Sequence, residues 1–207
     1  MGIAAQERQA LCDLFTEVGP AAPTLCGGWQ TKDLAAHLVV RERRPEAAGI
    51  LLKPLADRLD RIQQDYAAKP WSDLVQQVRS GPPWYWPTRI GTLDELTNTA
   101  EFFIHHEDVR RAKPGWEPRE PDKRRDAALW QIVSRMGKLL VRSSPVGIQL
   151  RTPSGRQTTA KHAANPVTII GEPGELLLYA YGRDETRLDF DGDPTAVDTV
   201  QSISRGL

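Results

Sequence analysis

The segment TLDELTNTAEFFIHHEDVRRA, residues 92–112, most constrains what this chain can fold into. Successive residues of an α-helix turn by about 100°, so side chains three or four positions apart share one face. The polar stripe that results consists of Asn98, Glu101, His105 and Asp108. Apolar residues such as Phe102 and Ile104 flank this stripe on both sides. The pattern indicates a helix whose polar line faces the interior of a helical bundle rather than water.

A polar line inside a bundle predicts paired charges or a metal, because isolated buried charges are costly. Glu101 and His105 stand one turn apart, close enough to hold one ion, although such a pair also occurs as a salt link on a solvated face. His37, in GGWQTKDLAAHL, is the candidate third ligand, with a hydrogen-bonded core histidine as the alternative. Together the three would form a His2Glu set, which catalytic zinc and non-haem iron sites use with positions left open.

Composition excludes several classes of protein. The 207 residues contain 27 basic and 27 acidic side chains, so no net charge attracts nucleic acid or an anionic membrane. No apolar run approaches the roughly 18 to 20 residues that span a bilayer, and Glu7 and Arg8 interrupt the region where a signal peptide is apolar. Cys12 and Cys26 are predicted to be buried, reduced thiols. We therefore expect a cytoplasmic protein without a nucleic-acid or membrane partner.

Hydrophobic periodicity predicts an α+β protein in two parts. Helices are expected over 4–17, 31–44, 49–67, a short stretch after 72, 92–113 and 122–142. From residue 144 the pattern changes to short strands in VGIQLRTPSGRQTTAK, PVTIIG and TRLDFDG, with helices in EPGELLLYAYGR and DPTAVDTVQSIS. We predict a helical metal-binding bundle over 1–143 and a small α+β domain over 144–207.

Three stretches also carry a family resemblance. GGWQTKDLAAHL resembles the Trp-x-x-x-Asp-Leu-x-x-His signature of DinB-like metal-binding bundles. EFFIHHEDV resembles the Glu-x-x-x-His-x-x-Asp segment of their mycothiol-dependent maleylpyruvate isomerase branch, and PVTIIGEPGELLLYAYGR followed by DFDGDP is similar to its C-terminal domain. The resemblance implies a DinB-like four-helix bundle with a small α/β lobe. The resemblance also implies that His37, Glu101 and His105 are the ligands of a divalent metal. Zinc is the expected metal, with nickel or iron as alternatives. Within the family, the sequence resembles an actinobacterial subgroup of metal-binding proteins.

The resemblance further implies chemistry with a small thiol. Family members of known activity use mycothiol for isomerisation or S-transfer, so we expect a metal-activated thiolate that attacks an electrophilic small molecule. Residues 70–89 depart from the family pattern, and the maleylpyruvate isomerase activity itself is therefore not carried over. Two alternatives stay open, a non-catalytic metal- or small-molecule-binding protein and a hydrolase that uses zinc-bound water.

Four more residues are candidates for the site. Asn98 and Asp108 are expected to orient the metal ligands through hydrogen bonds, with exposed helix polarity as the alternative. Arg41, one turn after His37, is a candidate catalytic residue that binds an acidic thiol or a carboxylate, with a surface salt bridge as the alternative. Arg183 is a second candidate for binding a carboxylate, reaching from the second domain.

Other conspicuous residues are expected to lie apart from the site. His106 points about 100° away from His105 on the helix, and His162 lies in a polar stretch. Trp84, Tyr85 and Trp86 either line a pocket or pack between helices.

Overall fold

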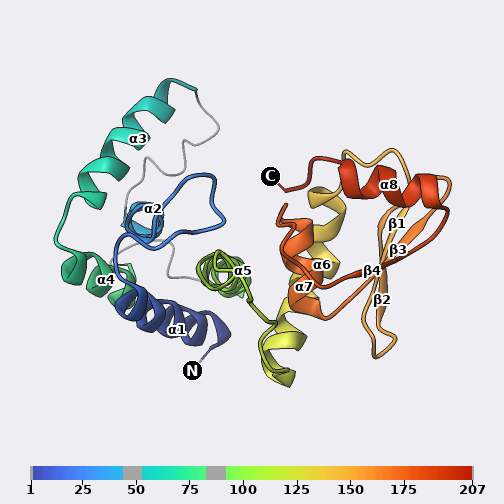
Figure 1. The fold of residues 1–207 in the computed structure, drawn as a ribbon, viewed down its shortest axis with the longest axis horizontal. Helices are drawn as coiled ribbons and strands as arrows, with labels where there is room; N and C mark the ends of the chain where they lie inside the picture. The colour runs from blue at the N-terminus through green and yellow to red at the C-terminus, as the bar shows by residue number, and fades with distance from the viewer. Residues whose placement is uncertain (1, 44–52, 83–91, 207) are drawn as a thin grey trace. The chain divides into compact units, whose positions relative to one another are not determined.

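The computed structural model describes residues 2–43, 53–82 and 92–206, without side chains for 53–57 and 92–94. In this part of the chain, eight helices and one four-stranded sheet confirm the predicted α+β class (Figure 1). The chain divides into two compact units, Met1–Glu117 and Pro118–Leu207. Trp84, Tyr85 and Trp86 lie outside the described residues. None of the helices in the described ranges is long and apolar enough to cross a membrane.

The first unit is helical. Its helices are α1 Ile3–Val18, α2 Thr31–Arg43, α3 Lys53–Ala67, α4 Trp71–Ser80 and α5 Thr92–Arg110. Helix α1 packs along α5 and against α4, while α2 packs against α3 and α4. We expected a four-helix bundle, and the described part of this unit contains five helices because the short α4 joins the packing.

The core of the first unit lies among α1, α2, α4 and α5. Its largest fully buried side chains include Phe15, Leu34, Leu38, Leu74 and Phe102, and Phe15 meets the ring of Trp71 edge-on at 5.5 Å. Each such side chain stabilises the fold by about 1.5–3 kcal/mol relative to exposure. These apolar contacts fix α2 and α5, the two helices that carry the candidate ligands.

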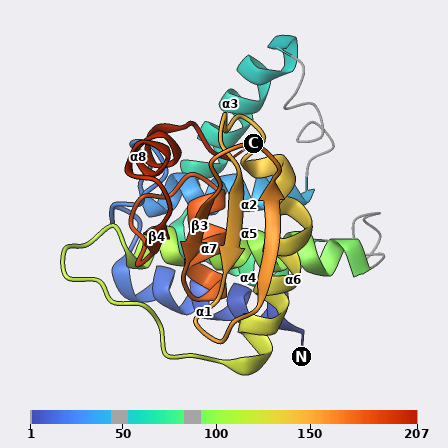
Figure 2. The same cartoon turned by 90° about the vertical axis from the view of Figure 1, so that its right-hand side faces the viewer.

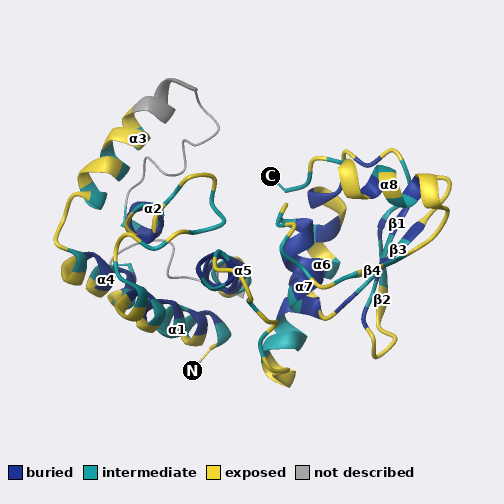
Figure 3. Ribbon diagram, in the orientation of Figure 1, coloured by how far each residue is buried: buried dark blue, intermediate teal, exposed yellow. Residues whose placement is uncertain are grey.

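Helix α5 is buried around nearly its whole circumference from residue 99 to 109 (Figure 3). Its buried residues include the polar Thr99, His105, His106, Glu107 and Asp108. Of the predicted polar line, His105 and Asp108 face the protein interior, while Asn98 and Glu101 are partly exposed. Buried polar groups of this kind need hydrogen-bonding or charged partners.

The second unit combines three helices with a small mixed sheet. Its elements are α6 Lys123–Leu140, β1 Ile148–Arg151, β2 Gln157–Lys161, β3 Val167–Ile170, α7 Pro173–Ala180, β4 Asp189–Asp191 and α8 Pro194–Ser202. The strand order is β2-β1-β3-β4 (Figure 2). Strand β1 pairs antiparallel with β2 and parallel with β3, and β3 pairs antiparallel with β4.

Helix α6 requires a correction to the predicted domain boundary. We placed this helix in the first domain, ending at residue 143, but it packs against α7 and β2 of the second unit. A Cβ atom at Gly137 would make ordinary van der Waals contacts of 3.4 Å with Leu150 and 3.5 Å with Ala160, so α6 lies directly against the sheet. The boundary therefore lies between Glu117 and Pro118 rather than after residue 143.

Candidate metal centre

The three predicted metal ligands converge on one point in the first unit. His37 Nε2, on α2, lies 3.2 Å from Glu101 Oε1, on α5. His105 Nε2, one turn further along α5, lies 3.3 Å from the same oxygen. The candidate donor atoms of the three residues all lie within 4.8 Å of one another. The cluster therefore joins residues that are 64 positions apart in the chain.

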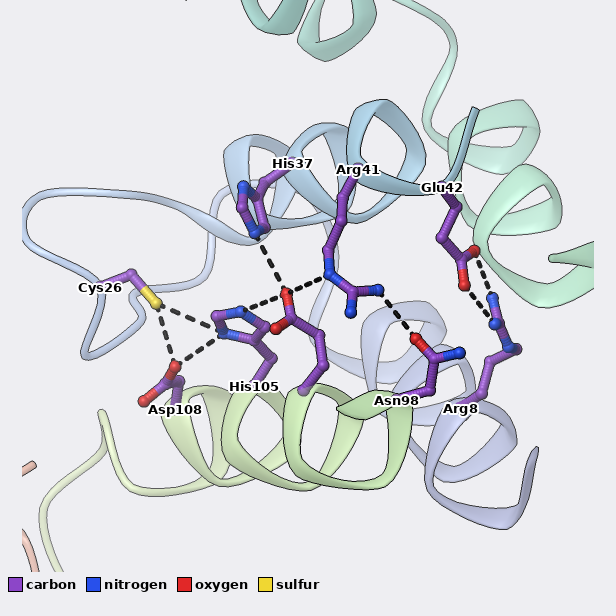
Figure 4. A network of polar contacts seen from close by, with 9 residues as sticks. Arg8, Cys26, His37, Arg41, Glu42, Asn98, His105 and Asp108 are labelled. Carbon is purple, nitrogen blue, oxygen red and sulfur yellow. Dashed lines mark hydrogen bonds and ion pairs between the residues drawn. The ribbon is translucent and has the colours of Figure 1, made fainter. Parts of the chain in front are cut away.

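Packing of α2 determines where His37 points. Leu34 and Leu38, on the same helix, are completely buried in the core, while the His37 side chain is partly exposed and turns toward α5 (Figure 4). Its ring meets the His105 ring edge-on at 5.5 Å and the indole of Trp29 at 5.3 Å. His37 is thus held between an aromatic side chain and the second histidine.

The spacing of the donor atoms suits a divalent metal. Bonds of about 2.0–2.2 Å at a tetrahedral angle place neighbouring nitrogen and oxygen ligands about 3.3–3.5 Å apart. The observed distances of 3.2 and 3.3 Å to Glu101 Oε1 are close to this separation. The side chains of His37 and Glu101 are 24% and 22% exposed, so a small molecule can reach this cluster from solvent. Two imidazoles and one carboxylate are also donors that zinc accepts.

Glu101 carries the negative charge of the cluster. Burial alone would raise the pKa of its carboxyl group, but hydrogen bonds from His105 and His37 and the charge of Arg41 hold that pKa well below its usual range. Glu101 is therefore ionised at neutral pH, which is the form that coordinates a metal.

Arg41 lies beside the carboxylate, one turn along α2 from His37. Its Nε is 3.4 Å from Glu101 Oε1, and its Nη1 donates a hydrogen bond of 2.9 Å to Asn98 Oδ1. This hydrogen bond orients Arg41, and the expected role of Asn98 in orienting a metal ligand stays a prediction. The Arg41 side chain is partly exposed, so its guanidinium can also meet an anion from solvent. Its role toward a substrate stays a prediction.

The opposite nitrogen of His105 faces a buried carboxylate. His105 Nδ1 lies 2.9 Å from Asp108 Oδ2, and the Asp108 side chain is completely buried. Burial alone would lower the pKa of His105, but hydrogen bonds with Asp108, Cys26 and Glu101 raise it well above its usual value. Asp108 therefore occupies the position from which a carboxylate orients a metal-binding imidazole.

Cys26 contacts both His105 and Asp108, and we did not anticipate these contacts from the sequence. Its Sγ lies 3.0 Å from Asp108 Oδ2 and 3.7 Å from His105 Nδ1 (Figure 4). Neither cysteine forms a disulfide bond, but only Cys12 is fully buried. Burial raises the pKa of the Cys12 thiol to about 11, against the opposing charges of Arg79 and Arg8. The available signal was weak: Cys26 stands just before Gly27-Gly28 and the resemblance motif that begins at Trp29.

The remaining sequence candidates lie elsewhere. Arg183 belongs to the second unit and donates a hydrogen bond of 2.8 Å to the carbonyl of Tyr181, and its reach toward the metal ligands stays a prediction. His106 Nδ1 lies 3.3 Å from Glu7 Oε2 of α1, and His162 is exposed in the second unit. Neither histidine contributes to the donor set of His37, Glu101 and His105.

Comparison with known proteins defines the kind of fold. The helical unit followed by a small sheet is similar to the crystal structure of the mycothiol-dependent maleylpyruvate isomerase, with a TM-score of 0.53 and 16% identity over 91% of this chain and 90% of that chain. A histidine-to-alanine variant of that isomerase gives a TM-score of 0.51 at 15% identity over the same shares. No family model and no curated protein matches the chain. At these identities the likeness shows the fold, which supports the expected fold family without defining a subgroup.

Proposed function

We propose that this protein is a metal-dependent enzyme in which a small thiol, mycothiol, attacks an electrophilic small molecule. The reaction is an isomerisation or an S-transfer. The observation that carries the proposal is the convergence of two imidazole nitrogens and one carboxylate oxygen at 3.2 and 3.3 Å. The similarity in fold to a mycothiol-dependent isomerase supports the use of a thiol.

His37, Glu101 and His105 would hold the metal, with zinc proposed first and nickel or iron as alternatives. When bound with an open coordination position, such an ion lowers the pKa of a thiol and keeps the thiolate in place. Asp108 accepts a hydrogen bond from His105 Nδ1, so Nε2 is the nitrogen that would give up its proton to coordinate a metal in this site. Glu101 supplies an ionised carboxylate.

Other residues of the first unit would bind and orient the reactants. Arg41 is held by Glu101 and Asn98, so its guanidinium is fixed near the cluster and can bind a carboxylate of the thiol or the electrophile. The indole of Trp29 beside His37 offers an apolar surface next to a charged one. A fixed cation and an apolar wall together favour small organic acids over neutral or basic molecules.

Metal analysis of the purified protein is the first test. We expect at least one zinc ion per chain in the wild type. The His37→Ala variant should contain at least one ion fewer than the wild type. The exposed His162 provides the matched control, because His162→Ala removes an imidazole and should leave the metal content unchanged. An unchanged metal content in a folded His37→Ala variant would contradict the assigned ligands.

A thiol-consumption assay then tests the chemistry. Mycothiol is incubated with a panel of electrophiles and with wild-type protein, His37→Ala or chelator-treated protein. We expect consumption that requires both metal and His37. Metal binding without thiol consumption would favour the non-catalytic binding protein, and ester or amide hydrolysis without thiol would favour the zinc hydrolase.

A further inference from the structure

A second set of donor atoms lies on the other side of His105. Cys26 Sγ, Asp108 Oδ2 and His105 Nδ1 surround one point, while His105 Nε2 belongs to the first set. We propose that these three atoms form a second cation site, selective for a thiophilic divalent ion such as Zn²⁺, with the imidazole of His105 shared between the two sites. The inference rests on the proposed function only through this shared histidine.

Of the three distances within this second set, the one between sulfur and imidazole is close to that of a tetrahedral site, and the two contacts with Asp108 are shorter. With a Zn–S bond of about 2.3 Å and Zn–N and Zn–O bonds of about 2.0–2.2 Å, neighbouring ligands lie about 3.3–3.6 Å apart. Cys26 Sγ lies 3.7 Å from His105 Nδ1 and 3.0 Å from Asp108 Oδ2, and His105 Nδ1 lies 2.9 Å from Asp108 Oδ2. Lengthening the two contacts with Asp108 by about half an ångström each would admit the ion. Coordination at opposite nitrogens of one ring would place the two ions about 6 Å apart.

The loop before α2 fixes the sulfur in this position. The backbone N–H of Leu25 donates to the carbonyl of Asp108 at 3.0 Å, which ties the loop to α5 next to the site. The N–H of Cys26 donates to Thr24 Oγ1, and its carbonyl accepts from the N–H of Trp29 at 2.7 Å. Gly28 completes this turn at φ 82, a conformation that glycine adopts easily. The thiol is therefore positioned by backbone contacts rather than by chance surface geometry.

Charge and exposure favour a cation there. Asp108 is a completely buried carboxylate that accepts hydrogen bonds from Cys26 and His105, and a divalent cation would take the place of the protons in these two hydrogen bonds. Sulfur, imidazole and carboxylate together form a donor set suited to zinc rather than to magnesium or calcium, which prefer oxygen alone. Cys26 is only partly buried, so an ion can enter from its side. On binding, the Cys26 thiol would release its proton to solvent. With an ion at each nitrogen, His105 would release both ring protons and bridge the two ions as an imidazolate, so that coordination replaces its hydrogen bond to Asp108.

Titration of chelator-treated protein with Zn²⁺ and with Co²⁺ tests the proposal. Stoichiometry is measured by equilibrium dialysis, and Co²⁺ reports sulfur ligation through thiolate-to-cobalt charge-transfer absorption in the near ultraviolet. We expect two ions in the wild type and one ion without charge-transfer absorption in Cys26→Ala. His37→Ala should bind one ion and keep that absorption. Cys12→Ala is the matched control, because it removes the buried cysteine and should match the wild type.

The outcomes separate this inference from the proposed function. Loss of all binding in Cys26→Ala, with no change in His37→Ala, would support the second site and remove the basis of the first. One ion in the wild type, with number and spectrum unchanged in Cys26→Ala, would overturn the second site and leave the first intact. The two-site proposal would also be overturned if the wild type bound a single ion and both Cys26→Ala and His37→Ala lost it. Weak binding that none of the substitutions changes would overturn it too. Circular dichroism and thermal unfolding verify that each variant is folded.

Discussion

His37 and His105 meet edge-on, with their ring centroids 5.5 Å apart and their planes at 74°, and both direct Nε2 toward the same oxygen of Glu101. One ring belongs to α2 and the other to α5, so neither helix holds the donor set by itself. The site therefore exists only when the first unit is folded. Any cation that binds it must stabilise the folded state relative to the unfolded chain.

Zinc is accordingly expected to raise the thermal stability of the first unit. An ion present at 100 times its dissociation constant adds about 2.7 kcal/mol to the free energy of unfolding, which corresponds to a rise of roughly 11 °C in the melting temperature of a unit of this size. Differential scanning calorimetry with zinc and with chelator measures this shift. His105→Ala, which removes a ligand common to both donor sets, should melt at the same temperature under both conditions. A zinc-dependent shift in that variant would contradict the assignment.

Acid pH should weaken metal binding because a proton competes for His105. Hydrogen bonds raise the pKa of His105 above its usual value despite burial, so the metal-free protein carries an imidazolium there at neutral pH. Below that pKa, each unit of decreasing pH should lower zinc affinity about tenfold if one proton is displaced. Competition with a zinc-binding dye at pH 6, 7 and 8 measures the slope. An affinity that is independent of pH over this range would contradict the prediction.

The metal-free protein should show the opposite trend in stability. A histidine whose pKa is higher in the folded state stabilises the fold fully below its unfolded value near 6.5, and this contribution is lost as the pH rises through the folded pKa. Chemical denaturation of chelator-treated protein above pH 6.5 measures the loss. Asp108→Asn removes one of the hydrogen bonds that raise the pKa of His105, so this variant should show a smaller dependence on pH.

The candidate ligand set was predictable from sequence because it depends on local spacing. Glu101 and His105 share a helix face whatever the rest of the chain does, and the apolar residues around them indicate a buried stripe. His37 required one further assumption, that its helix packs next to α5. The spacing of apolar residues also predicted the α+β class. Apolar residues recur every three to four positions in a helix and every second position in a strand, so the two kinds of segment can be told apart.

What could not be predicted depends on contacts between distant segments. Cys26 and Asp108 are 82 residues apart, and only the fold of the loop before α2 brings them together. The pairing of Arg41 with Asn98 is likewise set by the packing of α2 near α5. The apolar face of α6 indicated a packed helix but not its partner, so the domain boundary was placed too late.

The two cysteines should differ sharply in reactivity. At pH 8 the buried Cys12, with a pKa of about 11, carries about a hundredfold less thiolate than a thiol with the ordinary value of 9.0. Cys26 is partly exposed. In chelator-treated protein, a disulfide reagent such as DTNB should therefore modify Cys26 first and reach Cys12 only on unfolding. The fast phase should persist in Cys12→Ala and vanish in Cys26→Ala, and the reverse pattern would contradict the assignment.

Arg41→Lys tests whether the guanidinium recognises a carboxylate. Arginine reaches Glu101 through Nε and Asn98 through Nη1 at once, whereas lysine offers a single ammonium group and cannot reproduce this geometry. Since hydrogen bonds to charged groups contribute about 1.5–3 kcal/mol, KM for an acidic electrophile should rise at least about tenfold with little change in kcat. Metal content should stay at the wild-type value, because the ligands are intact.

Asn98→Ala provides the matched comparison for this variant. It leaves the guanidinium in place but removes the acceptor that orients it, so KM should rise by a smaller factor than in Arg41→Lys. Steady-state kinetics with one acidic electrophile and its neutral amide analogue separate charge recognition from general damage. If both substrates lose affinity equally in both variants, Arg41 supports the local structure rather than binding the carboxylate.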